Sequence, residues 1–361
     1  MSMKKKVVFV IPSLRGGGAE RIMVNIIRNL DWNKFSPTLV LLNREGPFIE
    51  LLPVELKVID LKSPRVRDSF FKLVKVLNKL KPDVVFATLG HLNLALVIIK
   101  YFLRKKPKII IREGNTPSRK WSEMSNFKRR LFTILYRQLY PQADLIIAQC
   151  KDMKYDLVNY LGIDHSKIKY IYNPLDVDKI KLDCQKDNPF VHKDRINILS
   201  VGRLTYAKGF DVLIDAFKIL HEELPNIHLT ILGEGKLKCT LEKRAEALNI
   251  GRNISFAGFK SNPYPYFFHS DTYVLSSRWE GFPNTLLEAL ACKSKVVATD
   301  CKSGPREILG DNEYGVLVPP EDCFALAKGI LKSINSANKS KRRAYDFDVK
   351  VIIKEYEKVI L

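Results

Sequence analysis

Hydrophobic positions in this 361-residue chain occur in short runs of β-branched residues, separated by longer amphipathic segments with helical period. The short runs are almost continuously apolar, which is typical of strands buried on both faces of a parallel sheet. Helical segments lie between most of them, as in α/β proteins. The predicted strands are Lys6–Ile11, Pro37–Leu42, Lys57–Asp60, Val84–Ala87, Lys108–Arg112, Leu145–Ala148, Lys169–Tyr172, Ile196–Val201, His228–Leu232, Ile254–Phe256, Thr272–Leu275, Lys295–Thr299 and Gly315–Val318.

These strands form two groups, each large enough for its own doubly wound sheet. We expect a first domain over residues 1–173 and a second over residues 174–345, divided at Asn173-Pro174. Residues 346–361 read as a last helix that periodicity alone does not place. In such sheets ligands bind beyond the carboxyl ends of the strands, so the loops after strands are where chemistry is expected.

Hydropathy and cysteine spacing favour a soluble cytosolic protein. Mean hydropathy is −0.10, and the longest apolar stretch, Leu92–Leu103, is too short to span a bilayer. The apolar run Val7–Ile11 ends at Pro12, which favours a strand over a signal peptide. The six cysteines form no Cys-x-x-Cys pair, so we expect reduced thiols and no metal site.

Charge is concentrated in the first half of the chain. Lys and Arg number 60 against 39 Asp and Glu, a formal net charge of +21. Residues 1–173 hold 32 of those basic residues and only 14 of the acidic ones. One basic half suggests a surface that meets polyanions, either nucleic acid or anionic lipid. A merely solvated basic face is the alternative.

Two loops combine glycine with cations. The first predicted strand leads into Arg15–Arg21, where three glycines let the backbone approach an anion at a helix N-terminus; a turn without ligand is the alternative. The second domain opens with Gly202-Arg203 and then Lys208-Gly209 at a helix start. Arginine and lysine so placed suit a diphosphate, although two solvated cations would look the same.

The segment Ser276–Leu290 carries two carboxylates, Glu280 and Glu288. Pro283 fits the first position of a helix, so Glu280 is predicted before the helix and Glu288 inside it. The rise per residue then puts Glu288 roughly 7–8 Å further along the axis, so the two would address different parts of one extended ligand. For this pair by itself, one capping and one surface glutamate is the better reading.

In this order, these segments resemble glycosyltransferase family 4, whose members are retaining, sugar-nucleotide-dependent transferases. The resemblance covers essentially the whole chain and implies an α/β protein of GT-B fold, with two Rossmann-like doubly wound domains facing a central cleft. It rests on Glu280-x7-Glu288 within SRWEGFPNTLLEAL, the Gly-Gly-x-Glu-Arg loop, Gly-Arg-Leu-x3-Lys-Gly, LGEG and YNPLDVDKI. The segments REGNTPSR, QLYPQADLIIAQC, GFKSNPYPYF and SGPREILGDNEYGVLV look like those of bacterial enzymes, particularly N-acetylgalactosaminyltransferases, that build lipid-linked oligosaccharides.

The resemblance implies roles for individual residues. Arg203 and Lys208 would bind the donor diphosphate, Glu280 would contact the donor sugar near the reacting carbon, and Glu288 would hold the ribose hydroxyls. The helix 346–361 would cross back onto the first domain. The other implied donor-binding positions are Gly17, Gly18, Gly202, Phe259, Gly281, Phe282, Asn284, Thr285 and Leu286.

The sequence departs from the family after the fifth strand. Many members carry His there, whereas this chain has Gly114. Glu113, Arg112 and His91 are therefore candidates for the sugar or acceptor pocket, although an ordinary helix-start histidine explains His91 equally well.

The implied chemistry needs neither cofactor nor metal, because cations and helix N-termini stabilise the charge that develops on the diphosphate. The leaving diphosphate can accept the acceptor's proton in a same-face substitution. Asp176-Val177-Asp178 matches a metal–diphosphate motif of another transferase fold, but it falls in the linker, so we interpret it as coincidence.

The basic half then predicts a peripheral association with the cytoplasmic face of the inner membrane, in a cytoplasmic protein that takes a lipid-linked acceptor. The basic residues are Arg65, Arg67, Arg104, Lys105, Lys106, Lys120, Lys128, Arg129 and Arg130, with apolar neighbours Phe70, Phe71, Trp121 and Phe127. Each such cation near an anionic surface contributes about 1 kcal/mol.

We therefore expect transfer of N-acetylhexosamine, from UDP-GalNAc or UDP-GlcNAc, to an undecaprenyl-diphosphate-linked saccharide. UDP-galactose or UDP-glucose is the next choice of donor, and a non-catalytic nucleotide-sugar-binding scaffold is the alternative of another class. A nucleotide-sugar oxidoreductase should show Gly-x-Gly-x-x-Gly and Tyr-x3-Lys. The glycine motif is absent, and the fourth residue after Tyr155 is Asn159 instead of lysine. A nucleic-acid-binding protein should show a recognisable module, and none is found, so no nucleic-acid partner is expected.

Overall fold

The computed structural model describes residues 3–337 and 342–361, which form two compact units. Unit 1 comprises Met1–Pro174 and Val349–Leu361, and unit 2 comprises Leu175–Asp348. The expected divisions after residues 173 and 345 lie one and three residues from these limits.

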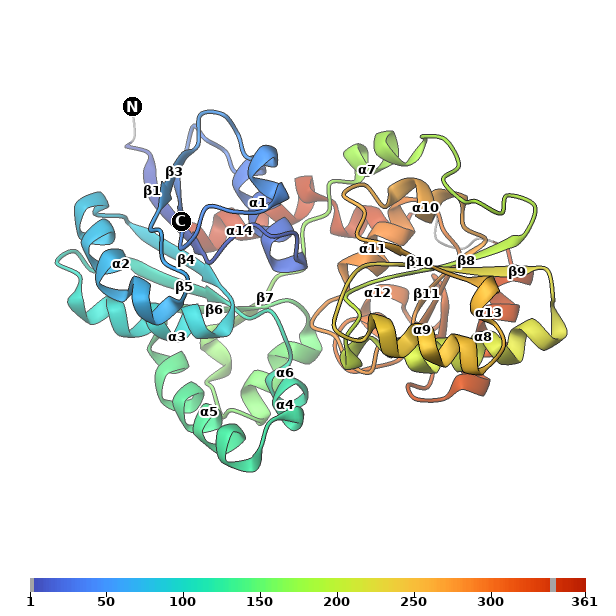
Figure 1. Cartoon of the computed structure of the whole chain (residues 1–361). Helices are drawn as coiled ribbons and strands as arrows, with labels where there is room; N and C mark the ends of the chain where they lie inside the picture. The colour runs from blue at the N-terminus through green and yellow to red at the C-terminus, as the bar shows by residue number, and fades with distance from the viewer. Residues whose placement is uncertain (1–2, 338–341) are drawn as a thin grey trace. The chain divides into compact units, whose positions relative to one another are not determined.

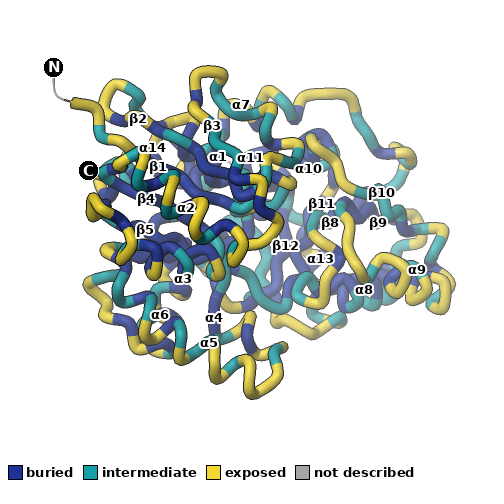
Figure 2. The backbone as a smooth tube through the Cα atoms, turned by 60° about the vertical axis from the view of Figure 1, so that its left-hand side comes forward, coloured by how far each residue is buried: buried dark blue, intermediate teal, exposed yellow. Residues whose placement is uncertain are grey.

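Unit 1 is built on a seven-stranded parallel sheet of order β3-β2-β1-β4-β5-β6-β7 (Figure 1). β4 is buried throughout, and β1, β2 and β5 are buried over most of their length, as parallel strands covered on both faces require (Figure 2). The strands are β1 Lys5–Ile11, β2 Phe35–Leu41, β3 Lys57–Asp60, β4 Val84–Thr88, β5 Lys108–Arg112, β6 Leu145–Ala148 and β7 Ile168–Tyr170. The longer helices are α1 Gly18–Asn29, α2 Val66–Leu80, α3 Gly90–Ile99, α5 Asn126–Leu139, α6 Lys151–Asn159 and α14 Val349–Ile360, and α4 Pro117–Lys120 is a single turn.

The last helix, α14, belongs to the core of unit 1 although it follows unit 2 in the chain. Its apolar face, with Ile352, Tyr356 and Ile360 buried, joins the cluster formed by β1 and α1. Figure 1 draws this helix in red beside the blue α1. The ring of Tyr356 lies 6.1 Å from that of Phe86 on β4, so α14 covers the sheet itself.

Unit 2 has a six-stranded parallel sheet of order β10-β9-β8-β11-β12-β13. Its strands are β8 Ile196–Val201, β9 Ile227–Leu232, β10 Ile254–Gly258, β11 Thr272–Leu275, β12 Val296–Thr299 and β13 Val316–Val318. Its helices are α7 Val177–Cys184, α8 Phe210–Glu223, α9 Lys238–Ala247, α10 Tyr264–His269, α11 Asn284–Ala291, α12 Pro305–Leu309 and α13 Cys323–Asn335. The apolar faces of α8 and α13 pack together over this sheet.

Each predicted strand is present, with ends shifted by at most two residues. The doubly wound α/β prediction is therefore confirmed for both units. Within the ranges that the structure describes, the helices are too short or too polar to span a membrane.

Candidate active site

The candidate site of unit 2 lies where β8 and β11 end. These strands are neighbours in the sheet, with Ile198 opposite Thr272 and Leu199 opposite Tyr273. Because the carboxyl ends of parallel strands meet at one sheet edge, the loop after β8 and the loop after β11 lie together. The predicted Lys208 and Glu280 come from these two loops.

Lys208 and Glu280 form a short ion pair, with Lys208 Nζ 2.5 Å from Glu280 Oε1. The hydroxyl of Ser277 donates to the same carboxylate oxygen at 2.6 Å. The two side chains are 21% and 10% exposed, respectively. Charge-assisted hydrogen bonds of this kind are strong and hold their groups in place. The structure thus brings together a cation and a carboxylate that the sequence proposed separately.

The turn that carries Lys208 depends on Gly209. This residue caps α8 with φ of 60°, and a Cβ there would lie 2.1 Å from the carbonyl oxygen of Ser276. Only glycine avoids both the left-handed strain and this clash. The stem of Lys208 passes over Gly202, where an added Cβ would sit 3.4 Å from Lys208 Cδ.

The helix after Glu280, α11, starts one residue later than predicted. Pro283 is the residue before the helix instead of its first residue, because its ψ of 101° is extended. Glu280 therefore precedes the helix and Glu288 lies inside it, as expected, and the Glu288 side chain is buried. The N–H of Leu286, one of the donor-binding positions that the resemblance implies, donates to the Pro283 carbonyl at 3.1 Å. The Thr285 hydroxyl accepts a hydrogen bond from Tyr273 at 2.7 Å.

The remaining donor-binding positions of unit 2 surround these loops. Arg203 is exposed and has no ion pair within the described residues. Phe259, directly after β10, is 46% exposed. Gly281 and Phe282 connect Glu280 to α11, and the Phe282 ring packs 5.8 Å from Phe347. Arg203 and Phe259 are thus open to solvent for a ligand.

Burial is the main cause of the raised pKa of Cys301, whose thiol lies near Glu280. Burial and the nearby Glu280 carboxylate raise the pKa of Cys301 to about 12. The Cys301 thiol is therefore protonated at neutral pH, which excludes it as a thiolate nucleophile.

The glycine loop of unit 1 follows β1. Gly17 caps α1, which begins at Gly18. A Cβ on Gly17 would lie 2.3 Å from Glu20 Oε2, so glycine gives the Glu20 carboxylate room to fold back over the helix start.

Arg112 lies at the end of β5 and is 1% exposed. Its guanidinium donates to Asn173 Oδ1, to the Tyr356 hydroxyl at 3.3 Å and to Thr88 Oγ1 at 3.5 Å. These bonds join β5 to the end of β4, to α14 and to the segment after β7. The Arg112 side chain is thus inside unit 1, with its donors directed to protein groups.

Glu113 is also buried, at 3% exposed. Its Oε1 accepts the backbone N–H groups of Gly114 and Asn115, and its Oε2 accepts the Tyr140 hydroxyl at 2.6 Å. Burial raises the pKa of Tyr140, and the nearby Glu113 charge adds to that shift. Tyr140 is therefore a hydrogen-bond donor that fixes Glu113.

His91 is the second residue of α3 and is exposed, with its ring edge-on to Phe132. Partial burial lowers its pKa, and the charge of Lys120 lowers it further against the opposing effect of Glu113. His91 is thus accessible and mainly neutral at pH 7.

Sequence reasoning missed Ser277, which fixes the Glu280 carboxylate within its own loop, and the pair Arg278 and Asp211, which joins that loop to the start of α8. The signal available in the sequence was the pair of polar residues, Ser276 and Ser277, directly after the buried strand β11. Trp121, predicted among surface apolar residues, is 3% exposed, because it packs edge-on against Tyr136 at 4.6 Å. That prediction was wrong for Trp121.

The predicted linker motif Asp176-Val177-Asp178 starts a helix. The Asp176 carboxylate accepts the Lys179 N–H at 3.1 Å and so caps α7. Across the described ranges, the structure shows no cluster of three or more His, Cys, Asp or Glu side chains suited to a metal ion.

Comparison with known families matches both units. Residues 184–346 match the model for glycosyl transferases group 1, and residues 16–179 match that for glycosyltransferase family 4.

Two similar proteins come from Campylobacter jejuni. The chain is 33% identical, over 99% of its length and all of the relative's, to N-acetylgalactosamine-N,N'-diacetylbacillosaminyl-diphospho-undecaprenol 4-alpha-N-acetylgalactosaminyltransferase. It is 27% identical, over 98% of both chains, to GalNAc-alpha-(1->4)-GalNAc-alpha-(1->3)-diNAcBac-PP-undecaprenol alpha-1,4-N-acetyl-D-galactosaminyltransferase.

Solved structures share the fold. Anabaena HepE, in complex with UDP and glucose, has a TM-score of 0.82 at 20% identity, over 99% of both chains. Sucrose-phosphate synthase from Thermosynechococcus elongatus has a TM-score of 0.79 at 16% identity, over 99% of this chain and 98% of that one.

Proposed function

The chain belongs to glycosyltransferase family 4 and has the GT-B fold, and from that premise we propose that it transfers N-acetylhexosamine with retention of configuration. The proposed donor is UDP-GalNAc or UDP-GlcNAc, and the acceptor is a saccharide on undecaprenyl diphosphate. The first donor and the acceptor are supported by the names of the Campylobacter jejuni relatives, and the nucleotide by the UDP bound to HepE.

The observation that carries the proposal is the Lys208–Glu280 pair beside the exposed Arg203. A diphosphate at these loops would meet two cations that are already in position, and the fixed charges would stabilise the leaving group as the anomeric bond breaks. Lys208 would then exchange part of its contact with Glu280 for a phosphate oxygen. No metal or cofactor enters this proposal.

The hydrogen bonding of Glu280 supports a same-face substitution. Its Oε1 accepts hydrogen bonds from both Lys208 and Ser277, so the lone pairs with which this oxygen would attack a carbon or take a proton are already engaged. The leaving diphosphate would take the acceptor's proton on the face from which it departs. Glu280 would stabilise the positive charge that develops at the anomeric carbon.

A panel of labelled nucleotide sugars with isoprenoid-diphosphate-linked acceptors tests the proposal. We expect transfer from UDP-GalNAc or UDP-GlcNAc and an α-linked product by NMR. A β-linked product would exclude retention, and preference for UDP-galactose or UDP-glucose would exclude the proposed sugar. UDP-sugar that raises Tm without any transfer would favour a non-catalytic scaffold.

We also propose that unit 1 binds the anionic membrane surface that holds this acceptor. Phe71, Tyr101 and Phe102 are 81%, 64% and 56% exposed, and the rings of Phe71 and Phe102 both lie within 6 Å of Phe70. Phe127, on α5 before the basic run 128–130, is 79% exposed. Exposed aromatic rings among cations suit a lipid interface.

Sedimentation with vesicles tests membrane binding. Wild type should bind vesicles of phosphatidylglycerol and release them at high salt, and Phe71→Ser with Phe127→Ser should bind several-fold less. Val54→Ser, at a 98% exposed apolar position of the same unit, is the control and should bind normally. Equal binding of all three proteins would contradict the proposed surface.

A further inference from the structure

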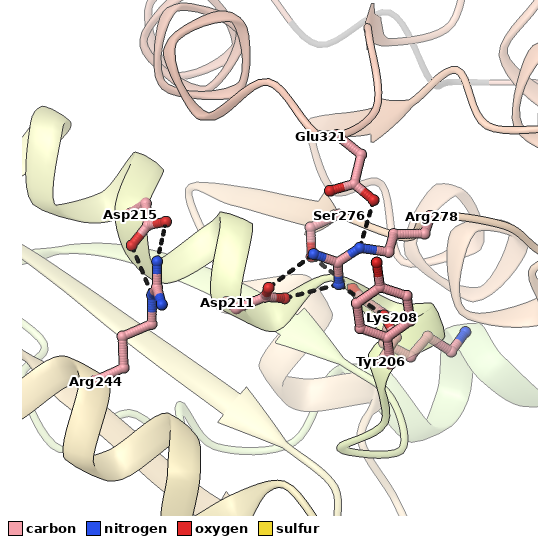
Figure 3. Close-up of polar contacts among 8 residues, drawn as sticks. All are labelled: Tyr206, Lys208, Asp211, Asp215, Arg244, Ser276, Arg278 and Glu321. Atoms are coloured by element: carbon pink, nitrogen blue, oxygen red, sulfur yellow. Dashed lines mark hydrogen bonds and ion pairs between the residues drawn. The ribbon is translucent and has the colours of Figure 1, made fainter. Parts of the chain in front are cut away.

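We propose that Arg278 is a positioning residue of the donor site, which fastens the turn carrying Lys208 to the loop carrying Glu280. This inference rests on the proposed function of Lys208 and Glu280. Arg278 stands two residues before Glu280 in the loop after β11, and the turn Tyr206–Lys208 follows β8. Figure 3 shows its guanidinium between Asp211, Glu321 and Tyr206.

The guanidinium makes four hydrogen bonds to protein groups. Its Nη1 and Nη2 bind the two carboxylate oxygens of Asp211 at 2.8 and 2.7 Å, and its Nε binds Glu321 at 2.5 Å. Nη1 also donates to the Tyr206 carbonyl at 2.8 Å. The Tyr206 ring lies 3.9 Å from the guanidinium carbon. With its side chain 7% exposed, Arg278 has no open edge for a phosphate, in contrast to the exposed Arg203.

Two further hydrogen bonds join the same two segments. The Arg278 N–H donates to the Ala207 carbonyl at 2.8 Å, and the Ser276 hydroxyl donates to the Lys208 carbonyl at 2.9 Å. Residues 206, 207 and 208 are thus each bonded to the segment 276–278. Arg278 is the member of that segment that also reaches α8, through Asp211 in its first turn.

Charge makes the arrangement sensitive to Arg278. Burial alone would raise the pKa of Asp211, but the hydrogen bond and charge of Arg278 outweigh it, so the pKa is lowered. Glu321 has a φ of 64°, in the left-handed region that residues other than glycine rarely adopt. Its carboxylate accepts the hydrogen bond from Arg278 Nε. Two carboxylates are therefore held next to the Lys208 turn by a single guanidinium.

A matched control lies one helical turn away. Asp215 follows Asp211 by four residues on α8 and binds Arg244 through both oxygens, at 2.8 and 2.6 Å (Figure 3). Arg244, on α9, does not contact the Lys208 turn and is 46% exposed. Arg244→Lys therefore removes the same bidentate geometry without touching the donor loops.

The experiment compares Arg278→Lys with Arg244→Lys in transfer assays with UDP-N-acetylhexosamine. Lysine keeps the charge but cannot bridge Asp211, Glu321 and Tyr206 at once, so Lys208 is displaced. We expect kcat to fall about 10- to 100-fold for Arg278→Lys, as for small misplacements of catalytic groups, and less than about twofold for Arg244→Lys. UDP should bind both variants with unchanged stoichiometry, and KM for the donor should change less than kcat.

The possible outcomes distinguish failure of the positioning role from failure of the proposed function. Equal kcat for both variants would overturn the inference. A fall in kcat for Arg278→Lys that matches a fall in the fraction of protein that binds UDP would also overturn it. If Arg278→Lys does not fold, Glu321→Ala, which removes one contact at an exposed residue, should lower kcat several-fold; an unchanged kcat would also overturn the inference. If Lys208→Ala retained transfer, the proposed function itself would be wrong. If Lys208→Ala lost transfer while Arg278→Lys kept a normal kcat, only the positioning role of Arg278 would be wrong.

Discussion

Lys208 Nζ and Glu280 Oε1 lie 2.5 Å apart, although their residues are 72 positions apart in the chain. Adjacent strands β8 and β11 create this contact, and Ser277 fixes the carboxylate from the side.

Lys208→Met and Glu280→Gln should each abolish transfer, and together they should separate activity from stability. Either single change removes the ion pair and leaves the mostly buried partner without this counter-charge, at a cost of about 1–3 kcal/mol in the free energy of unfolding. The double variant should recover much of that stability while remaining inactive. Urea unfolding and transfer assays measure both quantities, and an active double variant would contradict the site assignment.

Ser277→Ala should lower kcat about 10- to 100-fold, because a hydrogen bond to a charged group contributes about 1.5–3 kcal/mol. The Ser277 hydroxyl binds Glu280, and its carbonyl accepts Thr299 at 2.5 Å, a bond that alanine keeps. Ser277→Thr retains the hydroxyl and should recover part of the rate. An alanine variant with normal kcat would show that Glu280 needs no such support.

Gly209→Ala should unfold unit 2 or abolish transfer, because its Cβ would lie 2.1 Å from the Ser276 carbonyl oxygen in a left-handed backbone. Gly162→Ala is the control, since φ there is 69° and a Cβ added at this position would have no atom within 4 Å. That change should cost only about 1 kcal/mol of strain. Tm measurements distinguish the two, and equal losses would point to strain alone.

Arg112→Met should destabilise unit 1 by about 2–4 kcal/mol, because buried acceptors lose their donor. Asn173, Tyr356 and Thr88 would all be affected. Arg137→Met removes an exposed arginine of the same unit, with one bond to the Tyr160 carbonyl, and should change stability by about 0.5 kcal/mol or less. Urea titration tests the contrast.

Acid should destabilise unit 2 through His228. Burial, followed by the charges of His192 and Arg195, lowers the pKa of His228 to about 4. Below its usual pKa of about 6.5 the unfolded chain takes up a proton that the folded chain refuses. Stability therefore falls as pH drops from 6.5 towards 4, by up to about 3 kcal/mol.

The comparison variant is His228→Gln, which can keep a hydrogen bond to Ser255 but does not titrate. Its Tm should fall less than that of wild type between pH 7 and pH 4.5. Parallel Tm curves for the two proteins would contradict the assignment of this pH dependence to His228.

The sequence by itself determined the strands, the two sheets and the loops that carry the chemistry. Apolar runs report burial locally, and Gly209 and Pro283 mark turns by their own backbone limits. Motif order also identified the family, because Glu280, Glu288, Arg203 and Lys208 occur at the spacing that the family shares.

Only the tertiary structure decided which side chains meet. Periodicity left α14 without a partner, whereas folding buries Tyr356 against the sheet of unit 1. Folding also places the Arg112 side chain inside unit 1 and brings the Asp211 carboxylate to Arg278, because strand order brings together residues far apart in the chain. Hydrophobic pattern is a local property, whereas an ion pair or a buried hydrogen bond depends on which strands become neighbours.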